Sequence, residues 1–127
     1  MILDTSFLLD LKDWDGAAFE KGVESHERTQ RIVLVTVAEL YFGVEYTDSE
    51  AERRRVENLL SMYPVVVPRE AAARRAGELR ARAAREHDRD VGTADAIVGA
   101  VADLHDEPVV TANVDDFEAL GVDVETY

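Results

Sequence analysis

Several acidic residues in this sequence stand directly after an apolar segment or near the start of one. A charge at such a position is unusual in a sequence that serves only to form the fold. They are Asp4 after the first apolar run, Glu39 after RIVLVT, Asp95 within TADAIVGAVA, and Asp115 and Asp116 after PVVTA. Clustered carboxylates raise one another's pKa, and they stay ionised together only when a cation lies among them. Mg²⁺ and Mn²⁺ prefer oxygen ligands, lower the pKa of a bound water and stabilise charge on a phosphoryl oxygen. These acids therefore predict metal-assisted hydrolysis of a phosphodiester.

Each acid also has an ordinary structural explanation. An acid in the first turn of a helix complements the helix macrodipole, which is worth about 0.3–1 kcal/mol, and Asp95 fits this description. Glu39 follows Thr36 by three residues, as in a capping box, and Asp4 precedes a predicted helix that it could cap. The combination favours a site, because the carboxyl ends of parallel strands meet at one edge of a sheet.

The elements that would position these acids are short β-branched runs alternating with longer helical patterns. Near-continuous Val and Ile runs separated by helices are typical of a parallel sheet. We therefore expect an α/β domain with a central parallel β-sheet flanked by helices on both faces. The predicted strands are Ile2–Leu3, 31–36, 64–68, 108–112 and a short edge strand at 122–125. The predicted helices have caps at Thr36, Ser49 and Thr93, or span about 69–87 and 114–120.

Length and composition indicate one compact domain, which we place at residues 1–127. No apolar run approaches the roughly 20 residues needed to span a bilayer, and the N-terminal segment lacks the features of a signal peptide. We therefore expect a cytoplasmic protein without a membrane partner. The absence of cysteine excludes disulfides and thiolate metal sites.

The charge balance is strongly acidic. The chain has 27 acidic and 14 basic residues, a net charge of −13, and its only lysines are Lys12 and Lys21. Such a field repels nucleic acid at low salt. It is also typical of halophilic proteins, because salt at 1 M screens charges within about 3 Å. We favour the halophilic interpretation, in which the net charge says little about the substrate.

Four motifs together resemble the PIN-domain ribonucleases, and most closely the VapC toxins of type II toxin–antitoxin pairs. They are ILDTSFLLDL, TVAELYFGV, GTADAIVGAVA and VVTANVDDFEAL, and in this order they cover nearly the whole chain. The resemblance implies a PIN-like fold and a Mg²⁺- or Mn²⁺-dependent endoribonuclease that hydrolyses RNA with a metal-activated water. It also implies a cognate VapB-like antitoxin as a partner, and a homodimer.

The resemblance assigns roles to individual residues. Asp4 and Asp95 match the main metal ligands of the family. Glu39 matches a third acid, which binds metal or orients the attacking water. Some members have an aspartate at the position of Asn113, and others have an acid just before the aromatic residue, which matches Asp116. We therefore expect Asp116 to complete the site.

Other polar residues near these motifs have supporting roles in this interpretation. Asn113 would be a neutral polar ligand, and Asp115 is the alternative to Asp116. Hydroxyl groups would orient carboxylates or contact phosphate, although helix caps and strand-end polar residues explain them equally well. These hydroxyl residues are Thr5, Ser6 and Thr111.

A stripe of arginines offers positive charge for RNA or for an acidic part of an antitoxin. At 100° per residue its members fall within one arc of the predicted helix and its extension. A solvated helix face paired with Glu78 and Glu86 is the ordinary alternative. The stripe consists of Arg74, Arg75, Arg82, Arg85 and Arg89, whereas Arg53–Arg55 are surrounded by acids.

The segments around residues 40–62 are more apolar than one buried face requires. Most of these residues belong to the core, and a minority could form a groove for an antitoxin helix or tail. The residues are Leu40, Tyr41, Phe42, Val44, Tyr46, Val56, Leu59, Leu60 and Met62.

Two rival functions remain. Phosphoryl transfer through an aspartyl-phosphate is disfavoured, because it needs a second acid two residues after Asp4, where Ser6 stands, or a lysine after the fourth strand. A non-catalytic module that binds antitoxin or RNA is the alternative to the nuclease. The histidines, His26, His87 and His105, lie outside the motifs and are expected to be exposed and non-catalytic.

Overall fold

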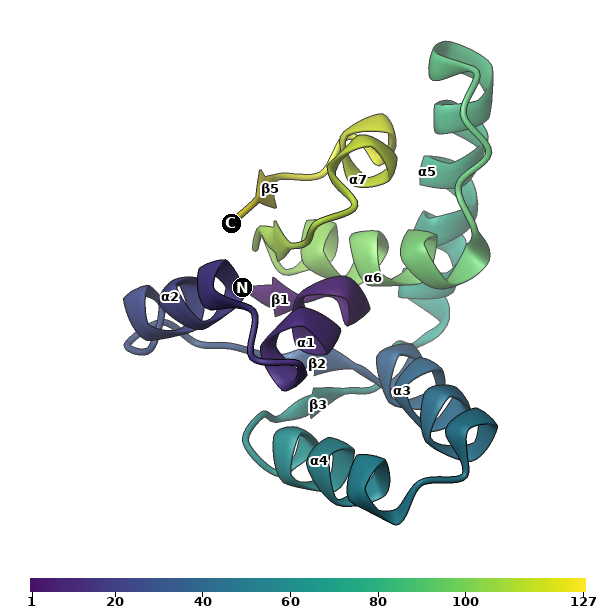
Figure 1. Cartoon of the computed structure of the whole chain (residues 1–127). Helices are drawn as coiled ribbons and strands as arrows, with labels where there is room; N and C mark the ends of the chain where they lie inside the picture. The colour runs from purple at the N-terminus through teal and green to yellow at the C-terminus, as the bar shows by residue number, and fades with distance from the viewer.

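The computed structural model describes residues 1–127 as short parallel strands connected by helices (Figure 1). None of the helices has the length and apolar character needed to cross a bilayer. The elements are β1 (Ile2–Leu3), α1 (Thr5–Lys12), α2 (Gly16–Glu24), β2 (Ile32–Val33), α3 (Leu34–Thr47), α4 (Glu50–Leu60), β3 (Val65–Val66), α5 (Glu70–His87), α6 (Thr93–Leu104), β4 (Val109–Val110), α7 (Val114–Leu120) and β5 (Val124–Glu125).

All strand pairs are parallel, as the sequence predicts. One sheet has the order β1-β4-β5, and β2 pairs with β3. A parallel bridge between Ile2 and Arg31 joins the two sheets, with the Leu3 N–H donating to the Arg31 carbonyl at 2.9 Å. β1 has the predicted bounds, and the other four strands are shorter than predicted. In the second run, for example, α3 already begins at Leu34 and leaves only Ile32–Val33 extended.

Helices cover both faces of the strands, which confirms the predicted layering. Successive strand residues point to opposite faces, so Ile2 packs in one apolar cluster and Leu3 in another. The first cluster is built with α5, α6 and α7, and the second with α1, α3 and α4 (Figure 1). The carboxyl end of β1 is therefore enclosed on two sides. Asp4 lies at this end and leads into α1.

The predicted helix starts are partly confirmed. Ser49 caps α4, accepting a hydrogen bond from the Glu52 N–H at 3.2 Å. The predicted cap at Thr36 is wrong, because Val33 is the N-cap and Thr36 is a buried residue inside the helix. The predicted cap at Thr93 is also wrong, since the N-cap is Gly92. Because the capping box does not form, it no longer explains Glu39.

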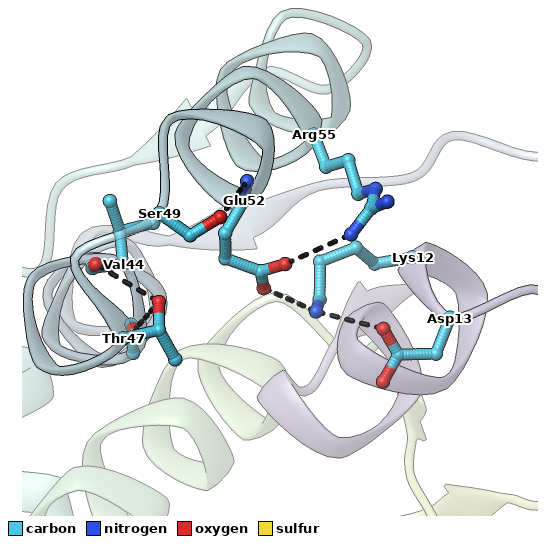
Figure 2. Close-up of polar contacts among 8 residues, drawn as sticks. Lys12, Asp13, Val44, Thr47, Ser49, Glu52 and Arg55 are labelled. Atoms are coloured by element: carbon cyan, nitrogen blue, oxygen red, sulfur yellow. Dashed lines mark hydrogen bonds and ion pairs between the residues drawn. The ribbon is translucent and has the colours of Figure 1, made fainter.

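A partly buried network of ion pairs connects α1 to α4. Figure 2 shows Lys12 between Asp13, at 2.8 Å, and Glu52, whose other oxygen accepts from Arg55 at 3.5 Å. The other lysine, Lys21, pairs with Glu125 at 2.8 Å. Both lysine side chains are largely buried, at 8% and 11% exposed. The free cationic groups on the surface of this chain are therefore arginines.

Candidate metal-binding and catalytic site

Asp4 lies at the end of β1, and only 3% of the residue is exposed. Its Oδ2 accepts hydrogen bonds from the Thr111 hydroxyl at 2.7 Å and the Ser6 hydroxyl at 2.9 Å. Its Oδ1 is buried without a hydrogen-bond partner. Asp4 precedes α1 but its side chain makes no capping bond, so capping does not explain it. A buried carboxylate oxygen without a donor is costly unless a ligand satisfies it.

Hydroxyl groups fix the strand ends around Asp4. Ser6 and Thr111 lie 3.1 Å apart through their oxygens, and the Ser6 oxygen accepts from the Ala112 N–H at 3.0 Å. The Thr111 oxygen accepts from the Asn113 N–H at 2.8 Å. These bonds join the turn after β1 to the turn after β4, and they hold the Asp4 carboxylate in one orientation.

Glu39 approaches the same region from α3. It is exposed, and its Oε1 accepts a hydrogen bond from the Thr5 hydroxyl at 2.8 Å. Thr5 is the first residue of α1, directly after Asp4. All three predicted hydroxyl residues, Thr5, Ser6 and Thr111, therefore contact either Asp4 or Glu39.

Asp95 has the most perturbed carboxyl group of the region. It stands in the first turn of α6, and its pKa is raised to about 6, first by burial and then by the charges of Asp4, Glu39 and Asp116. A hydrogen bond from the Asn113 amide, at 3.2 Å, opposes this shift. The charges that act on Asp95 come from β1, α3 and α7, so acids far apart in the sequence do converge here.

Asn113 connects Asp95 to Asp116. Its side-chain nitrogen also donates to Asp116 Oδ2, at 2.9 Å. Arg89 donates through Nε to Asp116 Oδ1, and this contact holds the pKa of Asp116 below its usual range. Asp115, the alternative fourth acid, is exposed and makes none of these hydrogen bonds.

The acids fit a hard divalent cation by their chemistry. No group of three or more comes close enough to enclose an ion in the present side-chain positions, although three of them lie near enough to act on Asp95 through charge. Charge acts over longer distances than ligation does, so the two observations are compatible. The donors are all oxygens, as Mg²⁺ and Mn²⁺ prefer, and the unpartnered Oδ1 of Asp4 offers an unused ligand atom.

The arginine stripe does not act as one surface. Arg74 pairs with Glu70 at 2.9 Å, and Arg75 pairs with Asp103 at 2.7 Å and Glu78 at 2.9 Å. No ion pair involves Arg82 or Arg85. Arg89 lies beyond the end of α5 and reaches the site acids. The prediction of paired acids is confirmed for Glu78, whereas Glu86 makes no such pair.

An apolar groove lies between α1, α2 and α4, only partly where the sequence placed it. It has a volume of 380 Å³. Leu59 and Met62 line it as predicted, while Leu40, Val44 and Val56 are core residues. Trp14 and Phe19, which sequence reasoning missed, supply much of its other wall. No periodic pattern marks these two residues, because Trp14 lies in the turn between α1 and α2, and Phe19 is on an exposed part of α2. The remaining polar lining residues are Lys12, Arg55 and Asn58.

The predicted exposure of the three histidines, His26, His87 and His105, is confirmed. None of them makes a hydrogen bond with a site acid, and the His26 ring bonds instead to the Val23 carbonyl at 2.8 Å. The candidate site therefore contains carboxylates, hydroxyls, one amide and one arginine.

Comparison with known proteins identifies the family. The PIN domain model matches residues 1–122. Ribonuclease VapC10 of Mycobacterium tuberculosis is 40% identical over 83 residues, which are 65% of this chain and 59% of that protein, so the match spans less than two thirds of the relative's length.

Solved structures give the same result. A DNA-bound VapBC complex of Salmonella typhimurium has a TM-score of 0.81 and 29% identity, covering 98% of this chain and 96% of that one. VapBC2 of Rickettsia felis, bound to a DNA fragment from its promoter, has a TM-score of 0.84 over the same shares, and its 18% identity supports the fold alone. Because the family model covers nearly the whole chain, this protein belongs to the PIN domain family.

Proposed function

We propose that this chain is a Mg²⁺- or Mn²⁺-dependent endoribonuclease and the toxin of a VapB–VapC-type pair. In this proposal, one catalytic domain spans residues 1–127 and acts on RNA in the cytoplasm. The observation that carries the proposal is that the buried Asp4, with its unpartnered Oδ1, and its neighbours Glu39 and Asp95 have no cationic partner. Burial and these neighbouring charges raise the pKa of Asp95 to about 6. Crowded acids without cations are costly to folding and are typical of functional sites. The names of the VapC relatives agree with this assignment.

Each acid has a role that follows from its surroundings. Asp4, held by two hydroxyls and with Oδ1 unpartnered, would be the fixed ligand, and Asp95 the second. Glu39 is exposed and oriented by Thr5, so it can accept a proton from an attacking water or bind it in place. Asp116 would complete the site through Oδ2, the oxygen that faces Asn113. A bound divalent cation would neutralise these charges and would act as a Lewis acid on the phosphoryl group.

An antitoxin is the second partner that we propose. The groove between α1, α2 and α4 is apolar, and Trp14 at its edge is 79% exposed with a positive φ of 62°. A bulky residue in this backbone region is strained, and an exposed apolar groove is typical of an interaction site. Arg55, with a side chain that is 59% exposed, and Asn58 also line the groove and give it a partly polar border suited to an amphipathic segment.

We also propose a homodimer and adaptation to high salt. Phe42 and Tyr46 are 71% and 82% exposed and stack at 5.9 Å on one face of α3, as expected of side chains covered by a second copy. The net charge of −13 and the burial of both lysines leave an acidic surface, as a halophilic protein would have.

A non-catalytic module that binds RNA or antitoxin is the alternative. It is favoured by one observation, that the acids do not enclose a cation in their present positions. A binding module has no need of metal for its function. The two proposals therefore differ in their response to metal removal and to loss of one acid.

The test is cleavage of total RNA by the purified chain at high salt, with Mg²⁺, with Mn²⁺ and with excess EDTA. We expect cleavage with either metal and none with EDTA. Asp95→Asn and Asp4→Asn should each lower the cleavage rate by at least about 10³-fold, while Asp115→Asn, an exposed neighbour, should leave it within about threefold. Cleavage that persists in EDTA would remove the metal from the proposal. RNA binding without cleavage under every condition would favour the non-catalytic module.

A further inference from the structure

Arg89 is the one cationic side chain that pairs with any of the four proposed site acids. Asp4 and Glu39 have only hydroxyl partners, and Asp95 has only the Asn113 amide. We propose that Arg89 binds an RNA phosphate group at the rim of the site, with Asp116 holding its guanidinium in place. This inference rests on the proposed ribonuclease function and deepens it, because it assigns the residue that receives the substrate backbone.

Only part of the Arg89 guanidinium makes hydrogen bonds within the chain. Its Nε donates to Asp116 Oδ1, while Nη1 and Nη2 donate no hydrogen bond within the chain. The side chain is 43% exposed. Two parallel N–H donors on a planar group match two phosphate oxygens. The free edge of Arg89 is therefore arranged to receive a phosphate without giving up Asp116.

Both ends of this pair are fixed by the backbone. Asp88, with φ of 50°, ends α5 in the left-handed conformation, and the next N–H, that of Arg89, donates to the Ala83 carbonyl at 3.2 Å. Asp116 lies in the first turn of α7, and its second oxygen accepts from Asn113. The arginine is thus held from the α5 side and its carboxylate from the α7 side, so the position of the guanidinium is constrained before substrate arrives.

Neighbouring charges restrict where a phosphate can lie. Arg89 lines a shallow cleft of 290 Å³ together with His87, Asp115 and Glu118. Asp115 and Glu118, both on α7, would repel a phosphate placed beside them. The exposed edge of Arg89 is therefore the part of this cleft where a phosphate group meets a positive charge.

Two arginines of α5, Arg80 and Arg74, are committed to structural contacts. Arg80 donates through Nε to the Val91 carbonyl at 2.6 Å and through Nη1 to Thr93 at 3.1 Å. Arg74 pairs with Glu70 one helical turn away, at 2.9 Å, and reaches no site acid. Arg74 therefore provides a matched control, because its removal changes the net charge by the same amount at the other end of α5.

The experiment compares Arg89→Gln, Arg89→Lys and Arg74→Gln in steady-state cleavage of one RNA oligonucleotide at saturating Mg²⁺. We expect Arg89→Gln to raise KM by about 10–100-fold, as for loss of a charged hydrogen bond, with a smaller change in kcat. Arg89→Lys should give an intermediate KM, because lysine keeps the positive charge but lacks the two parallel N–H donors of the guanidinium. Arg74→Gln should leave KM within about twofold. The slope of log KM against log salt concentration should fall by about one in Arg89→Gln.

Binding of Mn²⁺ alone, measured by calorimetry, separates substrate binding from an effect on the metal site. Arg89→Gln should bind Mn²⁺ as tightly as the unaltered chain or more tightly, since a competing cation has been removed from Asp116. Weaker Mn²⁺ binding, an unchanged KM, or an equal rise of KM in Arg74→Gln would each overturn the proposal. An unchanged KM together with weaker inhibition by the antitoxin would assign Arg89 to the protein partner instead. An unaltered chain that cleaves no RNA would count against the proposed function itself.

Discussion

Glu125 and Asp95 are both partly buried carboxylates, yet their surroundings shift their pKa values in opposite directions. Glu125, on the edge strand β5, accepts from Arg28 at 2.7 Å and from Lys21 at 2.8 Å, and these partners lower its pKa to about 2. Asp95, in the first turn of α6, has no cationic partner, and its pKa is raised to about 6 by burial and by neighbouring carboxylates. One acid stabilises the fold, while the other costs stability at neutral pH.

This contrast teaches how a site can be found in a chain with 27 acids. Other half-buried acids outside the site resemble Glu125. Glu107 pairs with Arg31 at 2.7 Å and with the N-terminal amine at 3.5 Å, and Glu52 pairs with Lys12 and Arg55. The site acids Asp4 and Asp95 have only hydroxyl and amide donors. Asp4 and Asp95 are thus distinguished from the other buried acids because they have no cationic partner, and not because they are acidic.

Among the groups that surround the site acids, the largest effect should come from removing a hydroxyl that donates to Asp4. Thr111→Val removes the 2.7 Å hydrogen bond to Asp4 Oδ2 and keeps the shape of the side chain. We expect the affinity for Mn²⁺ to fall by about 10–100-fold, as for loss of a group that orients a metal ligand. Calorimetric titration with Mn²⁺ measures this change.

Thr47→Val is the control for this prediction, because the Thr47 hydroxyl donates to the backbone of its own helix, to the Gly43 carbonyl at 2.9 Å. It should leave Mn²⁺ affinity unchanged. If both variants bind Mn²⁺ like the unaltered chain, Asp4 does not need its hydroxyl partners, and the account of its orientation is wrong.

Neutralising one acid of each kind should change stability with opposite signs. In metal-free buffer at pH 7.5, Asp95→Asn should raise the free energy of unfolding by about 1 kcal/mol, and Glu125→Gln should lower it by about 1 kcal/mol. Both changes are smaller than the pKa shifts alone would give, because the two side chains are partly exposed to solvent. Urea denaturation measures both, and changes of the same sign would contradict the comparison.

The pH dependence of these two changes follows from linkage. The pKa of Asp95 is higher in the folded state than its ordinary value of about 3.9, so its contribution to stability declines as pH rises from about 4 to about 6. The pKa of Glu125 is lower than its ordinary value of about 4.3. Its stabilisation is complete above about pH 4.3 and is lost as pH falls towards about 2. The gain in Asp95→Asn should therefore vanish below about pH 4.

The sequence predicted what depends on local pattern and not what depends on side-chain partners. Apolar runs located the strands. The acid at the end of the first run located Asp4, because strand ends of a parallel sheet must converge, and the acid in the first turn of an otherwise apolar helix located Asp95. Thr36 was misplaced as a cap, since α3 begins two residues earlier, at Leu34. The Arg89–Asp116 pair joins residues 27 apart in the chain, and no periodicity encodes it. The groove wall at Trp14 was missed for the same reason.

The smallest expected effect concerns the cause of the Asp95 shift. Burial is the largest contribution to its raised pKa, and the charges of Asp4, Glu39 and Asp116 come second. Salt screens charge over about 3 Å at 1 M but does not restore the water removed by burial. Between about 0.1 M and about 1 M KCl, the gain in Asp95→Asn should therefore fall by a few tenths of a kcal/mol and keep more than half of its value. The unaltered chain must be measured at each salt concentration, because its net charge of −13 makes its own stability rise with salt. A gain that disappears at about 1 M would mean that repulsion among the carboxylates, and not their burial, sets the cost of this site.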